Sequence, residues 1–126
     1  MSDRPSRTSQ STIGRLSINS KHQDDKHTLF LTGEIDVASA PVLAAAIDEL
    51  CAGGAREIVL DLCGVEFVDS SGLGAILQGK SLCERHNCAY SLTPAQRPVE
   101  RMFDMTGVKG RLHFRPTARG TLRSGR

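Results

Sequence analysis

The spacing of apolar residues along this chain changes repeatedly between that of a strand and that of a helix, which limits the folds it can adopt. Four short runs have the alternation or the β-branched content of strands: residues 16–18, 28–32, 57–62 and 89–92. Three longer stripes have helical spacing: residues 42–50, 71–85 and 96–106. Strand–helix–strand steps of this length make the joined strands parallel, because the helix has to carry the chain back along the sheet.

The first two strands are separated only by a polar turn over residues 20–26, so they are expected to pair antiparallel. Alternation at Leu112 and Phe114 predicts a last strand. The run at 57–62 is apolar at four of its six positions, as expected of a central strand covered on both faces. The sequence therefore predicts an α/β protein, a small mixed β-sheet with helices packed against it, in the order β-β-α-β-α-β-α-(β).

Residue types at the predicted helix ends support this assignment. Ser39 is a candidate N-cap of the first helix, Pro41 fits its first turn, and Gly53 and Gly54 would end it. Gly107 is expected to stop the third helix, because glycine readily adopts the left-handed conformation that follows a helix end.

The length of 126 residues suits one domain, which we place at residues 13–115. Residues 1–12 and 116–126 are rich in Ser, Thr, Arg and Gly and lack an apolar period, so flexible tails are predicted there. The C-terminal end is basic, because the chain carries six basic residues and no acidic residue from Lys109 onward.

Composition argues against several classes of partner. The net charge is only +2, and no Trp, one Tyr and four Phe leave little material for a surface that stacks nucleic-acid bases. No stretch approaches the roughly 20 apolar residues of a membrane span. The first residues lack the apolar run of a signal peptide. A cytoplasmic protein without membrane or direct nucleic-acid contact is expected.

The cysteine spacing shows no familiar metal motif. Cys51, Cys63, Cys83 and Cys88 form no C-x-x-C pair and have no histidine at zinc-site spacing. Reduced, partly buried thiols are expected, with no metal or cofactor; redox control is the alternative.

One segment matches the sequence pattern of a nucleotide-binding loop but not the structure that such a loop requires. Residues 74–81, GAILQGKS, begin at Gly74, end at Ser81 and match a phosphate-binding loop. That loop has to leave backbone N–H groups free for phosphate, whereas residues 75–78 continue a helical stripe. We therefore expect a helix in which Gly72, Gly74 and Gly79 are close-packing points. No nucleophile triad is apparent either, so no enzyme is predicted.

The most informative segment is the junction before this helix, with the sequence VDSSGLG over residues 68–74. Asp69 or Ser70 would cap the helix, and Ser70, Ser71 and Gly72 are small residues that leave the junction open. One interpretation is a helix cap without further function. The other is a regulated phosphorylation site, because a helix N-terminus tolerates a phosphate dianion.

Three segments together resemble a known family. They are LTGEID over residues 31–36, VDSSGLG over 68–74 and FDMTGV over 103–108. In this order and at these intervals they are similar to the STAS-domain anti-sigma factor antagonists of bacteria, across residues 13–115. The resemblance implies the same fold as the element order above.

The resemblance also implies a function. In that family the unphosphorylated protein binds an anti-sigma factor that is also a serine kinase, and this binding releases a sigma factor. The kinase phosphorylates the first serine of D-S-S-G, here Ser70, and a metal-dependent serine/threonine phosphatase reverses the reaction. Asp36, Asp69, Ser71 and Gly72 would form the environment of the phosphorylation site and part of the partner surface. Two alternatives stay open: a scaffold or regulatory STAS subunit of a larger sensory complex, and nucleotide binding through residues 74–81.

Overall fold

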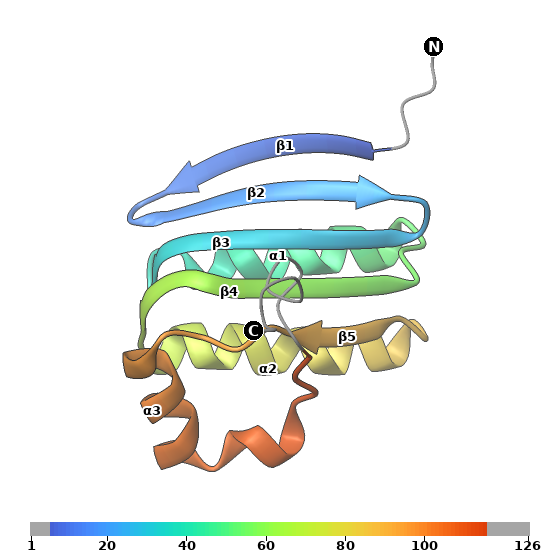
Figure 1. The fold of residues 1–126 in the computed structure, drawn as a ribbon. Helices are drawn as coiled ribbons and strands as arrows, with labels where there is room; N and C mark the ends of the chain where they lie inside the picture. The colour runs from blue at the N-terminus through green and yellow to red at the C-terminus, as the bar shows by residue number, and fades with distance from the viewer. Residues whose placement is uncertain (1–5, 116–126) are drawn as a thin grey trace, which may run out of the picture.

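The computed structural model describes the backbone of residues 6–115 and the side chains of residues 14–115. Five strands form one sheet in the order β1-β2-β3-β4-β5 (Figure 1). Their bounds are β1 (Ser6–Ile13), β2 (Leu16–Gln23), β3 (Lys26–Ile35), β4 (Glu57–Val68) and β5 (Ala89–Leu92). The pairs β1–β2 and β2–β3 are antiparallel, whereas β3–β4 and β4–β5 are parallel. The predicted mixed sheet is therefore confirmed.

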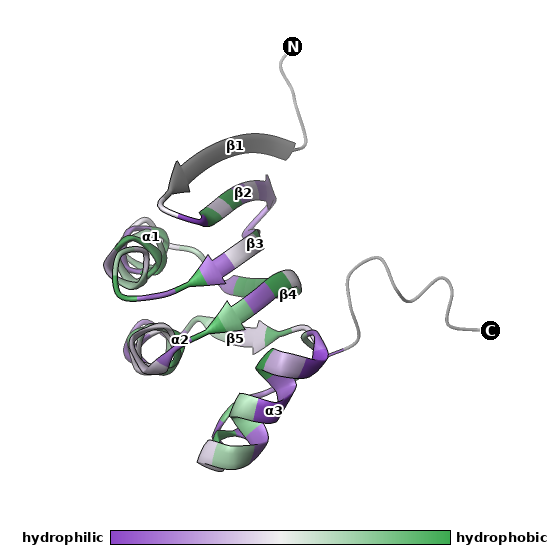
Figure 2. Ribbon diagram, turned by 90° about the vertical axis from the view of Figure 1, so that its left-hand side faces the viewer, coloured by the Kyte–Doolittle hydropathy of each residue, from purple (hydrophilic) through white to green (hydrophobic). Residues whose placement is uncertain are grey.

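Two long helices lie side by side on one face of the sheet, and a third lies near the β5 edge on the other side (Figure 2). The pair consists of α1 (Ala40–Ala52) and α2 (Ser70–Arg85), and the third helix is α3 (Arg97–Thr106). A 3₁₀ turn, η1 (Val108–Arg111), follows α3. All three helices agree with the predicted stripes. Gly107 ends α3 in the left-handed conformation, with φ 71°, as its position predicted.

Residues 58–62 of β4 are buried on both faces of the sheet. Ile58, Leu60 and Leu62 are fully buried, and the alternate residues Val59 and Asp61 are only 1% exposed. Successive side chains of a strand point to opposite faces. Both faces of this strand are therefore covered, one by the helix pair and the other on the side that carries α3. This confirms the prediction that the strand is central.

The prediction of a flexible tail at residues 1–12 is wrong for residues 6–12, which belong to β1. This strand pairs with β2 along its whole length, from Ser6↔Gln23 to Ile13↔Leu16. Its hydrogen bonds come from the backbone, which polar residues offer as well as apolar ones do. The lack of an apolar period in this segment therefore did not indicate a flexible tail. Residues 1–5 and the predicted tail at 116–126 lie outside the described residues.

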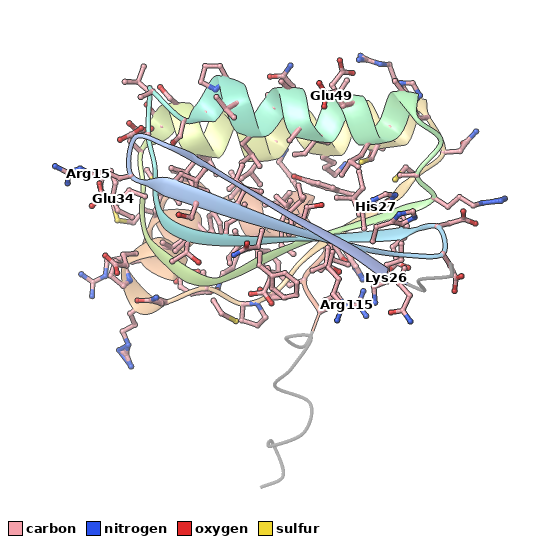
Figure 3. The ribbon with its side chains drawn as sticks, turned by 90° about the horizontal axis from the view of Figure 1, so that it is seen from above. Arg15, Lys26, His27, Glu34, Glu49 and Arg115 are labelled. Carbon is pink, nitrogen blue, oxygen red and sulfur yellow. The ribbon has the colours of Figure 1, made fainter. Side chains whose placement is uncertain are left out.

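The predicted last strand is reduced to one bridge. Phe114 forms an isolated parallel bridge with Leu92 of β5. The 3₁₀ turn η1 ends at Arg111, only three residues earlier, so little chain is left for a longer strand. The segment is nevertheless held to the sheet. Leu92 N–H donates to His113 O at 2.9 Å, and Arg115 pairs with Glu57 at 3.0 Å. Figure 3 shows Arg115 at the same end of the sheet as Lys26 and His27.

The central position of β4 leads to a stability prediction. Leu60→Ala should lower the free energy of unfolding by about 2–5 kcal/mol, because it removes a fully buried side chain and leaves a cavity. Leu77→Ala, at a half-buried position of α2, is the matched control and should cost less. Chemical denaturation measures both. A loss below about 1 kcal/mol for Leu60→Ala would contradict the burial of this strand.

Candidate functional site

The carboxyl ends of β3 and β4 lie at the same edge of the sheet, since the two strands are parallel (Figure 1). Each strand leads into a helix, β3 through a turn that begins at Asp36 into α1 and β4 through Asp69 into α2. Asp69 N–H donates to Ile35 O at 3.1 Å and joins the two strand ends. The structure therefore brings the predicted residues Asp36, Asp69 and Ser70 to one edge of the sheet.

Asp69 caps α2. Its backbone is extended, and its carboxylate Oδ1 accepts a hydrogen bond from Gly72 N–H at 2.9 Å. This choice between the two predicted caps leaves Ser70 as the first residue of the helix, exposed to solvent, with Ser71 half-buried behind it. The hydroxyl of Ser70 therefore lies at the positive end of a 16-residue helix whose first turn contains no acidic residue.

Asp36 organises the turn between β3 and α1. Its Oδ1 accepts hydrogen bonds from Ala38 N–H at 3.1 Å and Ser39 N–H at 3.2 Å. Ser39 occupies the predicted N-cap position, but its side chain makes no cap bond to the helix. Its hydroxyl instead lies 3.2 Å from Asp36 Oδ1 and 3.3 Å from Glu34 O, and it is completely buried. Ser39 thus stabilises the turn rather than the helix, because its backbone is already helical at φ −96° and ψ −18°.

A shallow groove separates the first turns of α1 and α2. Val37, Pro41 and Ala44 line one side, and Ser71, Gly74 and Gln78 line the other. Val37 is 71% exposed at the mouth of this groove, and Phe67, three residues before Ser70, is 47% exposed. Sequence reasoning missed both apolar residues. The one sequence feature that could have identified them is that each is an apolar residue near a strand–helix junction and outside every periodic stripe.

Charged side chains border this edge of the sheet. Arg15, in the turn between β1 and β2, pairs with Glu34 near the end of β3 at 3.5 Å. Figure 3 shows both side chains at the same end of the sheet, away from Lys26 and His27. The surface near Ser70 therefore combines an apolar groove with a neighbouring ion pair.

The phosphate-loop match is contradicted by its context. Residues 74–81 lie inside α2, where the backbone N–H groups are used by the helix. Lys80 pairs with Glu84 one helical turn away at 2.5 Å. Nucleotide binding through these residues is therefore excluded as an interpretation, as the helical stripe predicted.

The three glycines of α2 behave differently. A Cβ on Gly72 would lie 2.5 Å from Ile35 O, and one on Gly79 would lie 2.6 Å from the Tyr90 hydroxyl, so both are close-packing points as predicted. A Cβ on Gly74 would meet nothing within 4 Å, so the prediction for this residue is wrong. Gly74 faces the groove rather than a neighbouring element.

Among the described residues, no helix has the length and apolar content that crossing a membrane requires.

Comparisons with known proteins point in one direction. A family model described as "STAS domain" matches residues 17–120. Proteins named "Anti-sigma-B factor antagonist" are 31% identical in Staphylococcus aureus and 30% in Staphylococcus epidermidis, in each case over 99 residues, or 78% of this chain and 91% of the relative.

Solved structures are similar as well. An anti-sigma factor antagonist from Mycobacterium paratuberculosis has a TM-score of 0.71 at 25% identity, covering 85% of this chain and 91% of the other. The anti-sigma factor antagonist SpoIIAA in its unphosphorylated form has a TM-score of 0.66 at 20% identity, covering 92% of this chain and 93% of the other. The second likeness concerns the fold alone.

The glycines of α2 allow a matched test. Gly72→Ala should destabilise the protein by more than about 1 kcal/mol, because the new Cβ would overlap the backbone at Ile35. Gly74→Ala meets open space and should stabilise it by about 0.5–1 kcal/mol, because alanine favours the helix over glycine. Thermal or chemical unfolding compares the two variants. Equal effects would contradict the close contact between β3 and α2.

Proposed function

Because the chain belongs to the STAS domain family, we propose that it is an anti-sigma factor antagonist whose binding is switched off by phosphorylation of Ser70. In this proposal the unmodified protein binds an anti-sigma factor and so releases a sigma factor in the cytoplasm. The anti-sigma factor is also the kinase: it transfers the γ-phosphoryl group of ATP to the Ser70 oxygen, which loses its proton, and ADP leaves. A metal-dependent serine/threonine phosphatase hydrolyses the phosphoserine. The chain itself acts through binding rather than catalysis.

The observation that carries this proposal is the position of Ser70. It is the exposed first residue of α2, next to a groove whose rim includes exposed apolar residues. A kinase can reach such a hydroxyl without unfolding the domain. The names of the relatives supply the class of partner, since proteins 30–31% identical over most of this chain are named anti-sigma-B factor antagonists.

Phosphate at Ser70 should leave the domain folded. A phosphoserine adds about −1.5 to −2 charge near neutral pH. The unpaired N–H groups and the dipole at the start of α2 favour a negative charge there. The adjacent Asp69 carboxylate opposes the phosphate, but it keeps its own bond to Gly72 N–H. The added charge therefore stays on the surface.

The partner surface should respond much more strongly. Val37 is an exposed apolar side chain of the groove that Ser71, the neighbour of Ser70, also lines, and Phe67, three residues before Ser70, is exposed as well. Burying such side chains is the favourable part of a contact. A dianion carried into that desolvated contact without a cation to meet it costs several kcal/mol. Because about 1.4 kcal/mol is tenfold in affinity, phosphorylation should weaken binding roughly 100- to 1000-fold.

We assign separate roles to the neighbouring residues. The Asp36 carboxylate supports the turn that presents Val37, because it accepts the N–H groups of Ala38 and Ser39. Asp69 and Gly72 position the start of α2 through their mutual hydrogen bond. Ser71 contributes to the groove wall and is not the modified residue.

The switch is tested with the cognate anti-sigma factor and ATP. Mass spectrometry should find phosphate on Ser70, and the affinity measured by titration calorimetry should fall roughly 100- to 1000-fold. Ser70→Ala should bind and remain bound in the presence of ATP. Ser70→Asp should weaken binding less than phosphate does, because it carries a single charge. Ser71→Ala is the matched control and should still be modified. Phosphate on Ser71 alone, or unchanged affinity after full modification of Ser70, would contradict the proposal.

The partner surface is tested by charge insertion at two exposed apolar positions. Val37→Asp should weaken binding of the anti-sigma factor more than tenfold, because it places a charge in the apolar contact. Met105→Asp is the matched control on α3, at a position that is 78% exposed, and should bind normally. Equal effects of both substitutions would show that the contact does not center on the groove. If the protein is instead a scaffold, neither substitution should change its affinity for an isolated anti-sigma factor.

A further inference from the structure

Three of the four cysteines meet inside the molecule, at the end of the helix pair remote from Ser70. Cys51 lies in the last turn of α1, Cys83 in the last turn of α2, and Cys88 directly before β5. Their sulfur atoms all lie within 4.8 Å of one another, and Cys51 Sγ and Cys83 Sγ are 3.6 Å apart. Ser70 and Cys83 are 13 residues apart on one helix, a rise of about 20 Å. The cluster is therefore separate from the phosphorylation surface.

The three thiols are buried and held by the backbone around them. Their residues are 3%, 0% and 7% exposed, in the order Cys51, Cys83 and Cys88. Cys88 N–H donates to Cys83 O at 2.8 Å, which closes the turn between α2 and β5. The following residue, Ala89, donates its N–H to Arg56 O at 2.9 Å and fixes this turn to the start of β4. The three sulfur atoms are therefore already close together in the folded chain.

We propose that Cys51, Cys83 and Cys88 form a binding site for one thiophilic metal ion, Cu(I) in preference to Zn(II). Three sulfur atoms around an ion at a metal–sulfur distance of about 2.3 Å lie about 3.8 to 4.0 Å apart. The observed separation of Cys51 Sγ and Cys83 Sγ, 3.6 Å, is close to this range, and no pair of the three sulfur atoms is more than 4.8 Å apart. On binding, the three thiols release their protons to solvent and each sulfur forms one bond to the ion, so no oxidant or reductant is required.

The number of ligands favours Cu(I). Among the described residues, the cluster contains three sulfur ligands and no histidine or carboxylate. Structural zinc sites are almost always completed by four protein ligands, whereas a soft monovalent ion is well suited to thiolates alone. Tyr90, two residues after Cys88, donates its hydroxyl to Ile76 O at 2.7 Å. A phenol held in that hydrogen bond is a poor fourth ligand.

A disulfide between two of these cysteines would leave the third sulfur unused, whereas one ion can bind all three.

Metal binding would tie three elements together. The ion would bridge the ends of α1 and α2 and the start of β5, and an ion that binds only the folded chain stabilises it by mass action. The same two helices form the walls of the groove beside Ser70. The site would therefore stiffen the helix pair from the end opposite to the proposed partner surface.

The site is tested on the full, reduced chain by anaerobic titration with Cu(I) in competition with a bicinchoninate chelator. One ion per chain is expected, and X-ray absorption should show three sulfur neighbours at about 2.3 Å. Cys51→Ser, Cys83→Ser and Cys88→Ser should each weaken binding more than about 100-fold, since each removes a direct ligand. Cys63→Ser is the matched control, because this cysteine lies outside the cluster, and it should bind as the wild type does.

The outcomes that would overturn the proposal are distinct. Binding that survives Cys88→Ser would show that the three sulfurs do not act together, and binding lost in Cys63→Ser would place the ion elsewhere. Displacement of Cu(I) by equimolar Zn(II) would overturn the choice of metal. Circular dichroism checks that each variant folds. The sulfur count from X-ray absorption uses only the wild-type protein, so it decides the question even if a variant does not fold.

Discussion

The parallel pairing of β3 with β4 is the constraint on which the rest of the molecule depends. The pairing runs from Lys26↔Glu57 to Ile35↔Val68, so both strands end at the same edge of the sheet. Each then enters a helix that returns along the same face, which places the starts of α1 and α2 together and their ends together. The groove beside Ser70 and the cysteine cluster are thus opposite ends of one helix pair.

Close packing holds α2 in place while its first residue stays accessible. Gly72 allows the helix to approach the backbone at Ile35, and Gly79 allows it to approach Ile47 and Tyr90. Between them these contacts position the helix along much of its length. A charge added at Ser70 therefore has little freedom to move the helix. The proposed switch accordingly acts through the chemistry of the surface, and a change of fold is not needed.

Much of the fold could be predicted because it depends on local signals. Period and cap residues located all three helices, and the choice of Asp69 or Ser70 as cap was right for Asp69. The same local evidence rejected the phosphate-loop interpretation. It missed β1, because a strand that pairs through its backbone needs no apolar residues and leaves no period. It also assigned Gly74 to a packing contact, since spacing alone does not show which helix face has a neighbour.

For the candidate site, the sequence by itself determined which residues stand at the strand ends, Asp36 and Asp69, and that Ser70 follows a cap. Only the tertiary structure decided what surrounds them. It left Val37 exposed beside the groove and brought Cys51 within 3.6 Å of Cys83, 32 residues away along the chain. The physical reason is that capping and periodicity act over a few residues, whereas proximity between distant residues depends on how whole helices pack against the sheet.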